Sequence, residues 1–282
     1  MFCFLIAAIL EFTPQDANYS YEKAKEFVKT CTPRDSGTIR GSIAANYILD
    51  NTSAAGADIR RDVFTANTPK GQKNFVNLYA EFKGEDKDAR WVVLLSHYDT
   101  KSGVDCPGAN DGASTTALLM GIANAAMRCD VLKGNLLLVW TDGEECINNY
   151  GSDDGLWGAR RALKYVQERG YKVQAVINLD MLGDKDLSIS IPANGTPALA
   201  KIAEHAARRA GYPELVKSIP ETVTDDYVVF LEAGYKAVGL IDFNYGPKNS
   251  YWHSSDDTID KISEESLLKS GKIAVEMINI LM

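Results

Sequence analysis

The stretch Trp91-Val92-Val93-Leu94-Leu95-Ser96 decides the fold of this 282-residue chain. It is apolar at every position before Ser96, and a run of this length is typical of a strand buried on both faces of a sheet. Three further runs of the same kind cover residues 136–140, 175–179 and 237–241. Four such strands predict a mostly parallel sheet whose two faces are both covered by helices.

Helical stretches separate these runs. We expect helices at residues 21–30, 38–50, 113–128, 156–169, 197–210, 226–233 and 263–281, and two more strands at 59–64 and 75–82. Strands that alternate with helices predict an α/β fold of three layers, α/β/α, around a central mixed, mostly parallel sheet. Since no linker-like segment divides it, the chain from residue 19 to residue 282 is expected to form a single domain.

The first 18 residues allow two interpretations. Residues 1–10 form an apolar run that is too short to span a bilayer but has the length of the apolar core of an export signal. The favoured interpretation is the remnant of an export signal, with a periplasmic or extracellular location; the alternative is an arm packed on the domain, with a cytoplasmic location left open. No other segment is long and apolar enough for an integral membrane span.

The overall charge and the cysteines exclude some classes of function. The formal net charge of −8 argues against nucleic acid or an anionic membrane surface as a partner. The five cysteines include no Cys-x-x-Cys pair, which argues against a structural zinc knuckle.

Side chains suited to metal binding follow the apolar runs. His97 and Asp180 come directly after two of them, and Glu145 comes shortly after a third. Ligand sites of such sheets lie beyond the carboxyl ends of the strands. Asp111, in a glycine-flanked turn before a helix, and His253, in the loop before the last helix, complete a set of five candidate ligands. Carboxylates and imidazoles of this kind are the ligands of a hydrolytic zinc site.

Residues beside these candidate ligands supply further chemistry. Glu144 directly precedes Glu145, and a carboxylate that is not itself a ligand can serve as general base or acid. Asp99 could accept a hydrogen bond from the ring of His97 and so orient it. Trp252 could form one wall of a small pocket. Each feature alone has an ordinary structural explanation, but their common position at strand ends favours one site.

Together these motifs resemble those of metallopeptidase family twenty-eight, which includes zinc aminopeptidases and glutaminyl cyclases. The motifs are His97-Tyr98-Asp99, Gly108-Ala109-Asn110-Asp111-Gly112, Asp142-Gly143-Glu144-Glu145, Asn178-Leu179-Asp180 and Trp252-His253. The resemblance extends from about residue 20 to the C-terminus. It implies a zinc exopeptidase-like catalytic domain that holds one or two zinc ions and acts on the free N-termini of peptides or proteins.

The resemblance also implies which residues hold the metal. One position would be formed by His97, Asp111 and Asp180, and a second by Asp111, Glu145 and His253. Glu144 would be the catalytic acid and base. A cis peptide bond between Asp111 and Gly112 is expected as well, because the family turns its bridging carboxylate with such a bond.

Further details resemble the cyclases more than the aminopeptidases. Lys101 ends a cyclase-like motif, Asp225 lies where cyclases place a second catalytic carboxylate, and Tyr150 and Trp252 lie at the substrate pocket. The resemblance therefore favours a glutaminyl-peptide cyclotransferase, which converts N-terminal glutamine to pyroglutamate and ammonia. A zinc aminopeptidase is the alternative. From the residues alone, Asp225 could equally be the N-cap of the helix that follows it. The oligomeric state and the preferred N-terminal residue stay open.

Overall fold

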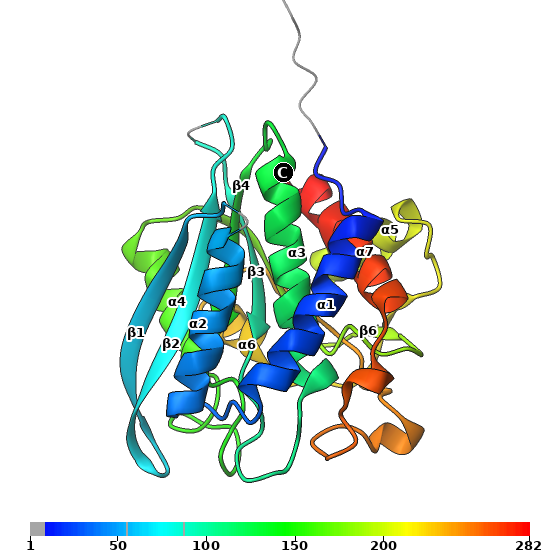
Figure 1. Cartoon of the computed structure of the whole chain (residues 1–282). Helices are drawn as coiled ribbons and strands as arrows, with labels where there is room; N and C mark the ends of the chain where they lie inside the picture. The colour runs from blue at the N-terminus through cyan, green and yellow to red at the C-terminus, as the bar shows by residue number, and fades with distance from the viewer. Residues whose placement is uncertain (1–8, 55, 87) are drawn as a thin grey trace, which may run out of the picture.

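The computed structural model describes residues 9–54, 56–86 and 88–282, and it has the expected three-layer α/β/α architecture (Figure 1). Eight strands of this described part form one mixed sheet. Their spatial order is β1 (Ile59–Thr68), β2 (Gly71–Phe82), β4 (Asn135–Thr141), β3 (Trp91–His97), β5 (Val173–Asp180), β8 (Ala237–Ile241), β6 (Ile189–Ile191) and β7 (Val216–Ser218).

The four apolar runs form the parallel centre of this sheet. β3 pairs in parallel with β4 on one side and with β5 on the other, and β5 pairs in parallel with β8. The outer pairs β1–β2, β2–β4 and β8–β6 are antiparallel, whereas β6–β7 is parallel. The expectation of a mixed sheet with a parallel centre is therefore confirmed.

Helices cover both faces of the sheet, which explains why its central strands are apolar throughout. One face packs against α1 (Pro14–Cys31), α2 (Ile39–Ala54), α3 (Thr115–Arg128), α5 (Pro197–Arg209) and α7 (Glu264–Leu281). The other packs against α4 (Trp157–Glu168) and α6 (Asp226–Glu232). Along β3, Val92 and Leu94 belong to the first interface, and Val93 and Leu95 to the second, because successive side chains of a strand point to opposite faces.

Helix α1 begins earlier than expected. Thr13 caps it: the Thr13 side chain accepts a hydrogen bond from the N–H of Asp16, and the Asp16 carboxylate accepts one from the N–H of Thr13. Just before the helix, Leu10 and Phe12 are buried in the core. The export-signal interpretation covers residues 1–18. Residues 1–8 of this stretch lie outside the described residues, whereas residues 14–18 form the start of α1. Within the described part, no helix is long and apolar enough to cross a membrane.

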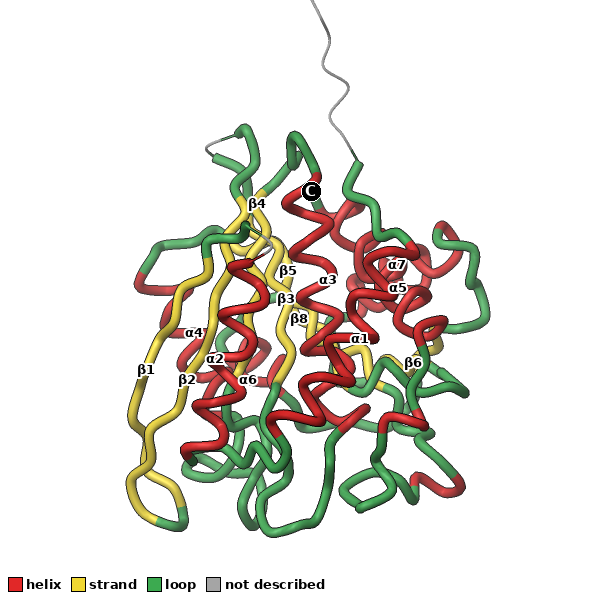
Figure 2. The backbone as a smooth tube through the Cα atoms, viewed as in Figure 1, coloured by secondary structure: helices red, strands yellow, loops and turns green. Residues whose placement is uncertain are grey.

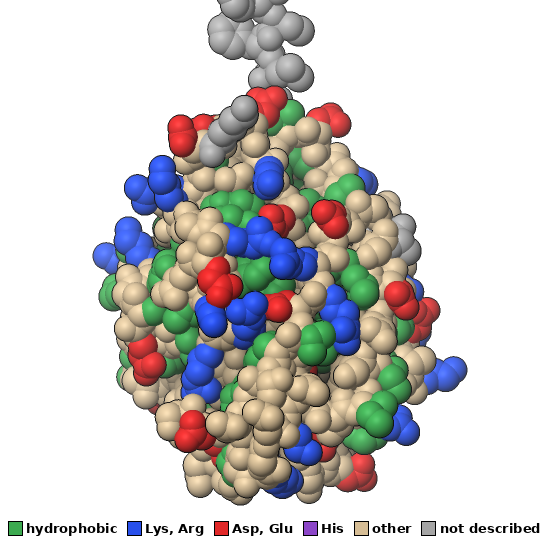
Figure 3. Space-filling view, turned by 90° about the vertical axis from the view of Figure 1, so that its left-hand side faces the viewer, with side chains coloured by type: hydrophobic (Ala, Val, Ile, Leu, Met, Phe, Trp, Pro, Cys, Tyr) green, Lys and Arg blue, Asp and Glu red, His purple; other side chains and the backbone are tan. Residues whose placement is uncertain are grey.

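Strand β1 lies at one edge of the sheet and pairs with β2 alone. On the side of the molecule that contains β1 and α4, Lys and Arg side chains gather near the centre (Figure 3). Two cations of α4 and its C-terminal cap have partners within the domain: Arg161 forms an ion pair with Asp62 of β1 at 2.6 Å, and Arg169 lies over the ring of Tyr165.

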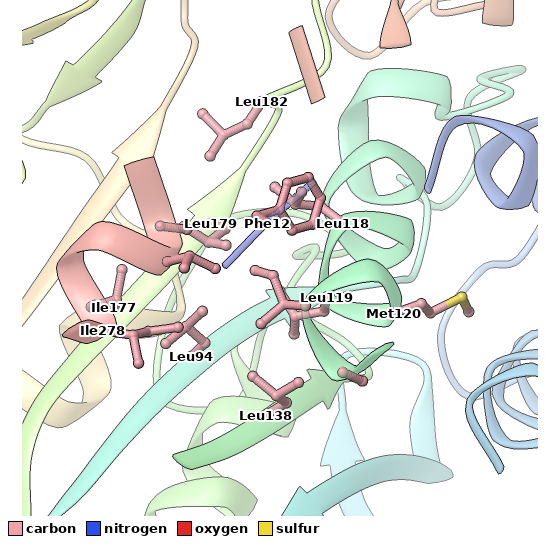
Figure 4. Close-up of a cluster of buried hydrophobic side chains, with 14 of the residues drawn as sticks. Phe12, Leu94, Leu118, Leu119, Met120, Leu138, Ile177, Leu179, Leu182 and Ile278 are labelled. Atoms are coloured by element: carbon pink, nitrogen blue, oxygen red, sulfur yellow. The ribbon is translucent and has the colours of Figure 1, made fainter. Parts of the chain in front are cut away.

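Leu94 provides a test of the core between the sheet and the larger helical layer. Its side chain is fully buried beside Leu138, Ile177 and Leu119 (Figure 4). Replacing it with alanine removes buried methyl groups and leaves a cavity, so the free energy of unfolding should fall by about 2–5 kcal/mol. Urea unfolding followed by circular dichroism measures this.

The matched control is Val63→Ala on the edge strand, where the side chain is 54% exposed. It should change the free energy of unfolding by no more than ~0.5 kcal/mol, as most surface substitutions do. Equal losses in the two variants would show that this interface is not the tightly packed core described above.

Candidate active site

The candidate site lies in loops that follow the parallel strands. His97 and Asp180 are the last residues of β3 and β5, and Glu145 lies shortly after the end of β4. The loops after these strands gather at one end of the molecule, at the bottom of Figure 2. His253 reaches the same place from the loop between β8 and α7. The arrangement follows the rule that sites of such sheets lie beyond the carboxyl strand ends.

The structure brings all five candidate ligands together in two triads that share Asp111. Nε2 of His97 lies 3.2 Å from Oδ1 of Asp111 and 3.1 Å from Oδ1 of Asp180. Nε2 of His253 lies 3.2 Å from Oδ2 of Asp111 and 2.7 Å from Oε1 of Glu145. Asp111 thus presents one carboxylate oxygen to each histidine, as a bridging ligand does.

The donor set fits a divalent cation. In each triad, a ring nitrogen and two carboxylate oxygens lie within 4.8 Å of one another. The two buried carboxylates of each triad repel each other at this distance unless positive charge lies between them. Oε2 of Glu145 is also buried, and the Nζ of Lys101 lies 3.3 Å from it as an ion-pair partner. Imidazole nitrogen and carboxylate oxygen are ligands that zinc accepts.

The histidine and carboxylate charges are strongly coupled. Burial lowers the pKa of His253, but the carboxylates of Asp111 and Glu145 outweigh this effect and raise it to about 9. Burial alone would raise the pKa of Asp111, yet His253 and His97 hold it below its usual range. The cluster therefore stabilises positive charge between its carboxylates.

The turn that carries Asp111 differs from expectation at one peptide bond. The bond between Asp111 and Gly112 is not cis; in the described part of the chain, the cis bond is Thr32–Pro33. The chain turns instead within a π-helical segment, Ala109–Ser114, in which Gly112 has a φ of 91°. Glycine adopts this left-handed conformation without steric cost, so the carboxylate is directed without a cis bond.

Asp99 contacts the neighbouring loop more closely than it contacts His97. Its Oδ1 lies 3.6 Å from Nδ1 of His97, which is too long for a hydrogen bond. Its carboxylate instead accepts the backbone N–H groups of Gly143, Glu144 and Glu145 at 3.0 to 3.2 Å. Asp99 thereby fixes the segment that carries both glutamates.

A cavity of about 230 Å³ adjoins the candidate ligands. The residues that line it are Asp111, Glu144, Glu145, Tyr150, Asp180, Thr222, Val223, Thr224, Asp225, Ile241, Phe243, Trp252 and His253. Tyr150 and Trp252, expected at a substrate pocket, both line this cavity. The hydroxyl of Tyr150 donates to Oε1 of Glu144 at 2.8 Å, and the ring of Trp252 stacks on that of His253 at 4.0 Å.

Glu144 and Asp225 are carboxyl groups of this cavity that belong to neither triad. Burial, and then the charge of Glu145, raise the pKa of Glu144 well above its usual range. Burial, and then the charge of Asp180, do the same for the pKa of Asp225. Asp225 is also the N-cap of α6, and it accepts a hydrogen bond from Asn178 at 2.5 Å. Burial therefore favours the protonated form of both groups.

The sequence did not predict several buried polar residues around the site. Asp226 accepts a hydrogen bond from Thr141, and burial raises its pKa to about 7. Arg34 and Asp257 contact the backbone of the Asp111 turn. Asp257 lies in the same stretch as His253 and could have been found there, whereas nothing marks Arg34 among the arginines of the chain.

An α/β/α fold with two histidine–carboxylate triads beyond the strand ends defines the class of zinc exopeptidase-like enzymes. The chain belongs to Peptidase family M28, whose model matches residues 77–278. This confirms the family that the motifs indicate.

Individual relatives fall in both branches. The chain is 27% identical over 265 residues to a glutaminyl-peptide cyclotransferase of Drosophila melanogaster, covering 83% of this chain and 73% of that protein. Its structure is similar to that of a glutaminyl cyclase of an Acidobacteriales bacterium, with a TM-score of 0.88, 31% identity, and coverage of 100% and 98% of the two chains. A leucine aminopeptidase precursor from Bacteroides thetaiotaomicron shares the fold, with a TM-score of 0.84, 23% identity, and coverage of 97% and 99%.

Proposed function

We propose that this protein is a zinc-dependent glutaminyl-peptide cyclotransferase that acts on peptide or protein N-termini. The observation that carries the proposal is the cavity beside the candidate metal centre, where Glu144 and Asp225 are buried carboxyl groups outside both triads. A carboxyl group that is not a metal ligand can move protons. The similarity to glutaminyl cyclases over most of the chain supports this choice.

The reaction needs one bond formed, one bond broken and one proton moved. The α-amine nitrogen of the N-terminal glutamine attacks the side-chain amide carbon, and the bond from that carbon to the amide nitrogen breaks, releasing ammonia. A bound zinc ion supplies polarisation of the amide carbonyl. His97, Asp111, Asp180, Glu145 and His253 are the residues that would hold it.

Glu144 carries the proton from the attacking nitrogen to the departing one. It lines the cavity, and Tyr150 fixes the carboxyl group through a hydrogen bond to Oε1. Asp225 provides a second buried carboxyl group in the same cavity. We infer that Asp225 supports the proton transfer as a second group that can share the proton with Glu144.

The cavity is suited to a single residue. Its 230 Å³ is below the roughly 300–1,000 Å³ of pockets that hold drug-sized ligands. Trp252, Phe243 and Ile241 form apolar walls, which can exclude water during cyclisation. Exclusion of water favours attack by the substrate amine over hydrolysis.

We also propose export to the periplasm or the extracellular space, on the basis of the apolar run at residues 1–10. Expression of the chain in a bacterial host, followed by fractionation and N-terminal sequencing, would detect the protein outside the cytoplasm. Recovery in the cytoplasm alone would favour the packed-arm interpretation.

A paired assay separates the two branches of the family. The purified protein should release ammonia from a peptide with N-terminal glutamine and form pyroglutamate, because the substrate amine is the nucleophile. It should release no product from leucine anilide at the same enzyme concentration. Release of free N-terminal residues without pyroglutamate would replace this proposal with the aminopeptidase alternative.

Asp225→Asn tests whether Asp225 has a role beyond that of a helix cap. Asparagine caps helices about as well as aspartate, and Asn178 can turn its amide to face the new side chain. The melting temperature should therefore change little, whereas pyroglutamate formation should fall about tenfold or more, because the amide cannot share protons with Glu144.

Asp225→Ala is the companion variant, since it removes the cap as well and should cost about 1 kcal/mol of stability. If Asp225→Asn keeps full turnover and only the alanine variant loses stability, Asp225 is a structural cap.

A further inference from the structure

Arg34 is a fully buried arginine whose acceptors are backbone carbonyls rather than carboxylates. It lies after α1 and makes four side-chain hydrogen bonds. Nε donates to the carbonyl of Tyr98 at 2.5 Å, Nη1 to that of Pro107 at 2.8 Å, and Nη2 to those of Gly108 and Asp111 at 2.6 and 3.1 Å. Burial of a charge is costly unless its hydrogen-bonding groups are satisfied.

These four carbonyls lie on the loop that connects two candidate metal ligands. Tyr98 follows His97, and Asp111 ends the other side of the loop. The backbone N–H of Arg34 also donates to the hydroxyl of Thr100, and the ring of Phe27 lies 5.0 Å from the guanidinium carbon. One side chain therefore holds both ends of the loop together.

Asp257 holds the same turn from the opposite side. It is fully buried, and its carboxylate accepts the N–H groups of Asn110 at 2.7 Å and Asp111 at 3.1 Å. The hydroxyl of Tyr245 donates to it at 2.6 Å. The N–H and the C=O of Asp111 are thus held by buried groups of opposite charge.

The packing around this turn leaves little freedom. Gly108 has a φ of 63°, and a Cβ atom at this position would lie 2.6 Å from Nη2 of Arg34 and 2.7 Å from the carbonyl oxygen of Asp111. Real Cβ atoms essentially never lie this close to another heavy atom. The guanidinium of Arg34 therefore packs directly against the backbone of Gly108. The orientation of the Asp111 carboxylate is therefore set by contacts on its own peptide groups.

We propose that Arg34 and Asp257 are a pair of positioning residues that orient Asp111 to bridge the two metal positions. The inference rests on the proposed metal centre, and it assigns the pair no contact with metal or substrate. Residues that orient metal ligands typically change metal affinity by about 10- to 100-fold when they are replaced. A role in packing α1 against the loop would instead change stability alone.

Cobalt(II) titration of the metal-free full chain measures this directly, because cobalt replaces zinc in such sites and its visible absorption reports ligand geometry. Arg34→Lys keeps the positive charge but loses the planar guanidinium group with its several N–H donors. Asp257→Asn replaces a carboxylate oxygen with an amide NH₂ group, which then faces a backbone N–H. Each variant should bind cobalt about 10- to 100-fold more weakly, with an altered spectrum. The double variant should lose less than the product of the two single effects, since both act on Asp111.

Arg128→Lys is the control for the same chemical change, because Arg128 pairs with Asp16 at 2.7 Å in the last turn of α3, whereas the Asp111 turn precedes the first turn of that helix. It should bind cobalt as the wild type does. Wild-type cobalt affinity and spectrum in both Arg34→Lys and Asp257→Asn, with only the melting temperature lowered, would overturn the proposal.

Two further outcomes are decisive. If Arg34→Lys does not fold, Asp257→Asn decides alone, because it preserves size and burial. If Asp111→Asn binds cobalt as tightly as the wild type, the proposed metal centre is wrong and the positioning role is overturned with it. If Asp111→Asn loses cobalt binding while Arg34→Lys and Asp257→Asn both keep it, the positioning role alone is overturned.

Discussion

Glu144→Gln is expected to lower turnover of a peptide with N-terminal glutamine by at least ~10²-fold, because general acid–base catalysis typically contributes a factor of this size to the rate. Glutamine preserves the size of the side chain and can still accept the hydrogen bond from Tyr150, but it cannot take up a proton. Since Glu144 belongs to neither triad, metal binding should be nearly unchanged. Ammonia release under saturating substrate measures the turnover.

The control for this variant is Glu168→Gln on α4, where the side chain is 52% exposed. It carries the same chemical change far from the cavity and should leave turnover unaltered. Near wild-type turnover in Glu144→Gln would show that another group moves the proton. An equal loss of bound metal and of turnover would instead place Glu144 among the ligands.

Removal of metal is expected to abolish activity. A chelator should reduce turnover to below detection, and added zinc should restore it, because the buried carboxylates and histidines have no other means of polarising the amide carbonyl. Metal that binds the folded chain but not the unfolded chain also raises the melting temperature. Elemental analysis before and after chelation gives the number of ions per chain.

Asp111→Ala should reproduce the effect of the chelator without recovery by zinc, since Asp111 supplies an oxygen to both triads. The control is Asp62→Ala on β1. It removes the carboxylate that pairs with Arg161 of α4, and this variant should keep its metal. Full activity after exhaustive chelation, with no metal detected, would contradict the whole metal-based mechanism.

The central strands and the gathering of the candidate ligands could be predicted because both leave local signals. A strand such as β3 is buried on both faces and is therefore apolar throughout, and the polar residue after it marks the edge where a site forms. Strands β6 and β7 have three residues each, too few to show a pattern. The start of α1 did leave a signal, in Thr13, Pro14 and Asp16, which are typical of a capped helix start.

Other features of the site depend on contacts between distant segments. Arg34 and Asp111 are far apart in the chain, and a buried arginine looks the same in sequence as an exposed one. The bond before Gly112 was expected to be cis from the resemblance, and this was wrong, because a left-handed glycine turns the chain at that point. Local sequence therefore predicted which groups assemble, but not how their backbone is held.

The open edge of β1 has a consequence for the protein at high concentration. This ten-residue strand offers unpaired backbone groups along one side, and such edges can recruit a second chain into a continuous sheet. Arg60 and Arg61 are exposed there, and charged residues at an edge oppose that kind of pairing because joining two sheets would strip them of water. We therefore expect these arginines to oppose aggregation of the folded chain through its own sheet.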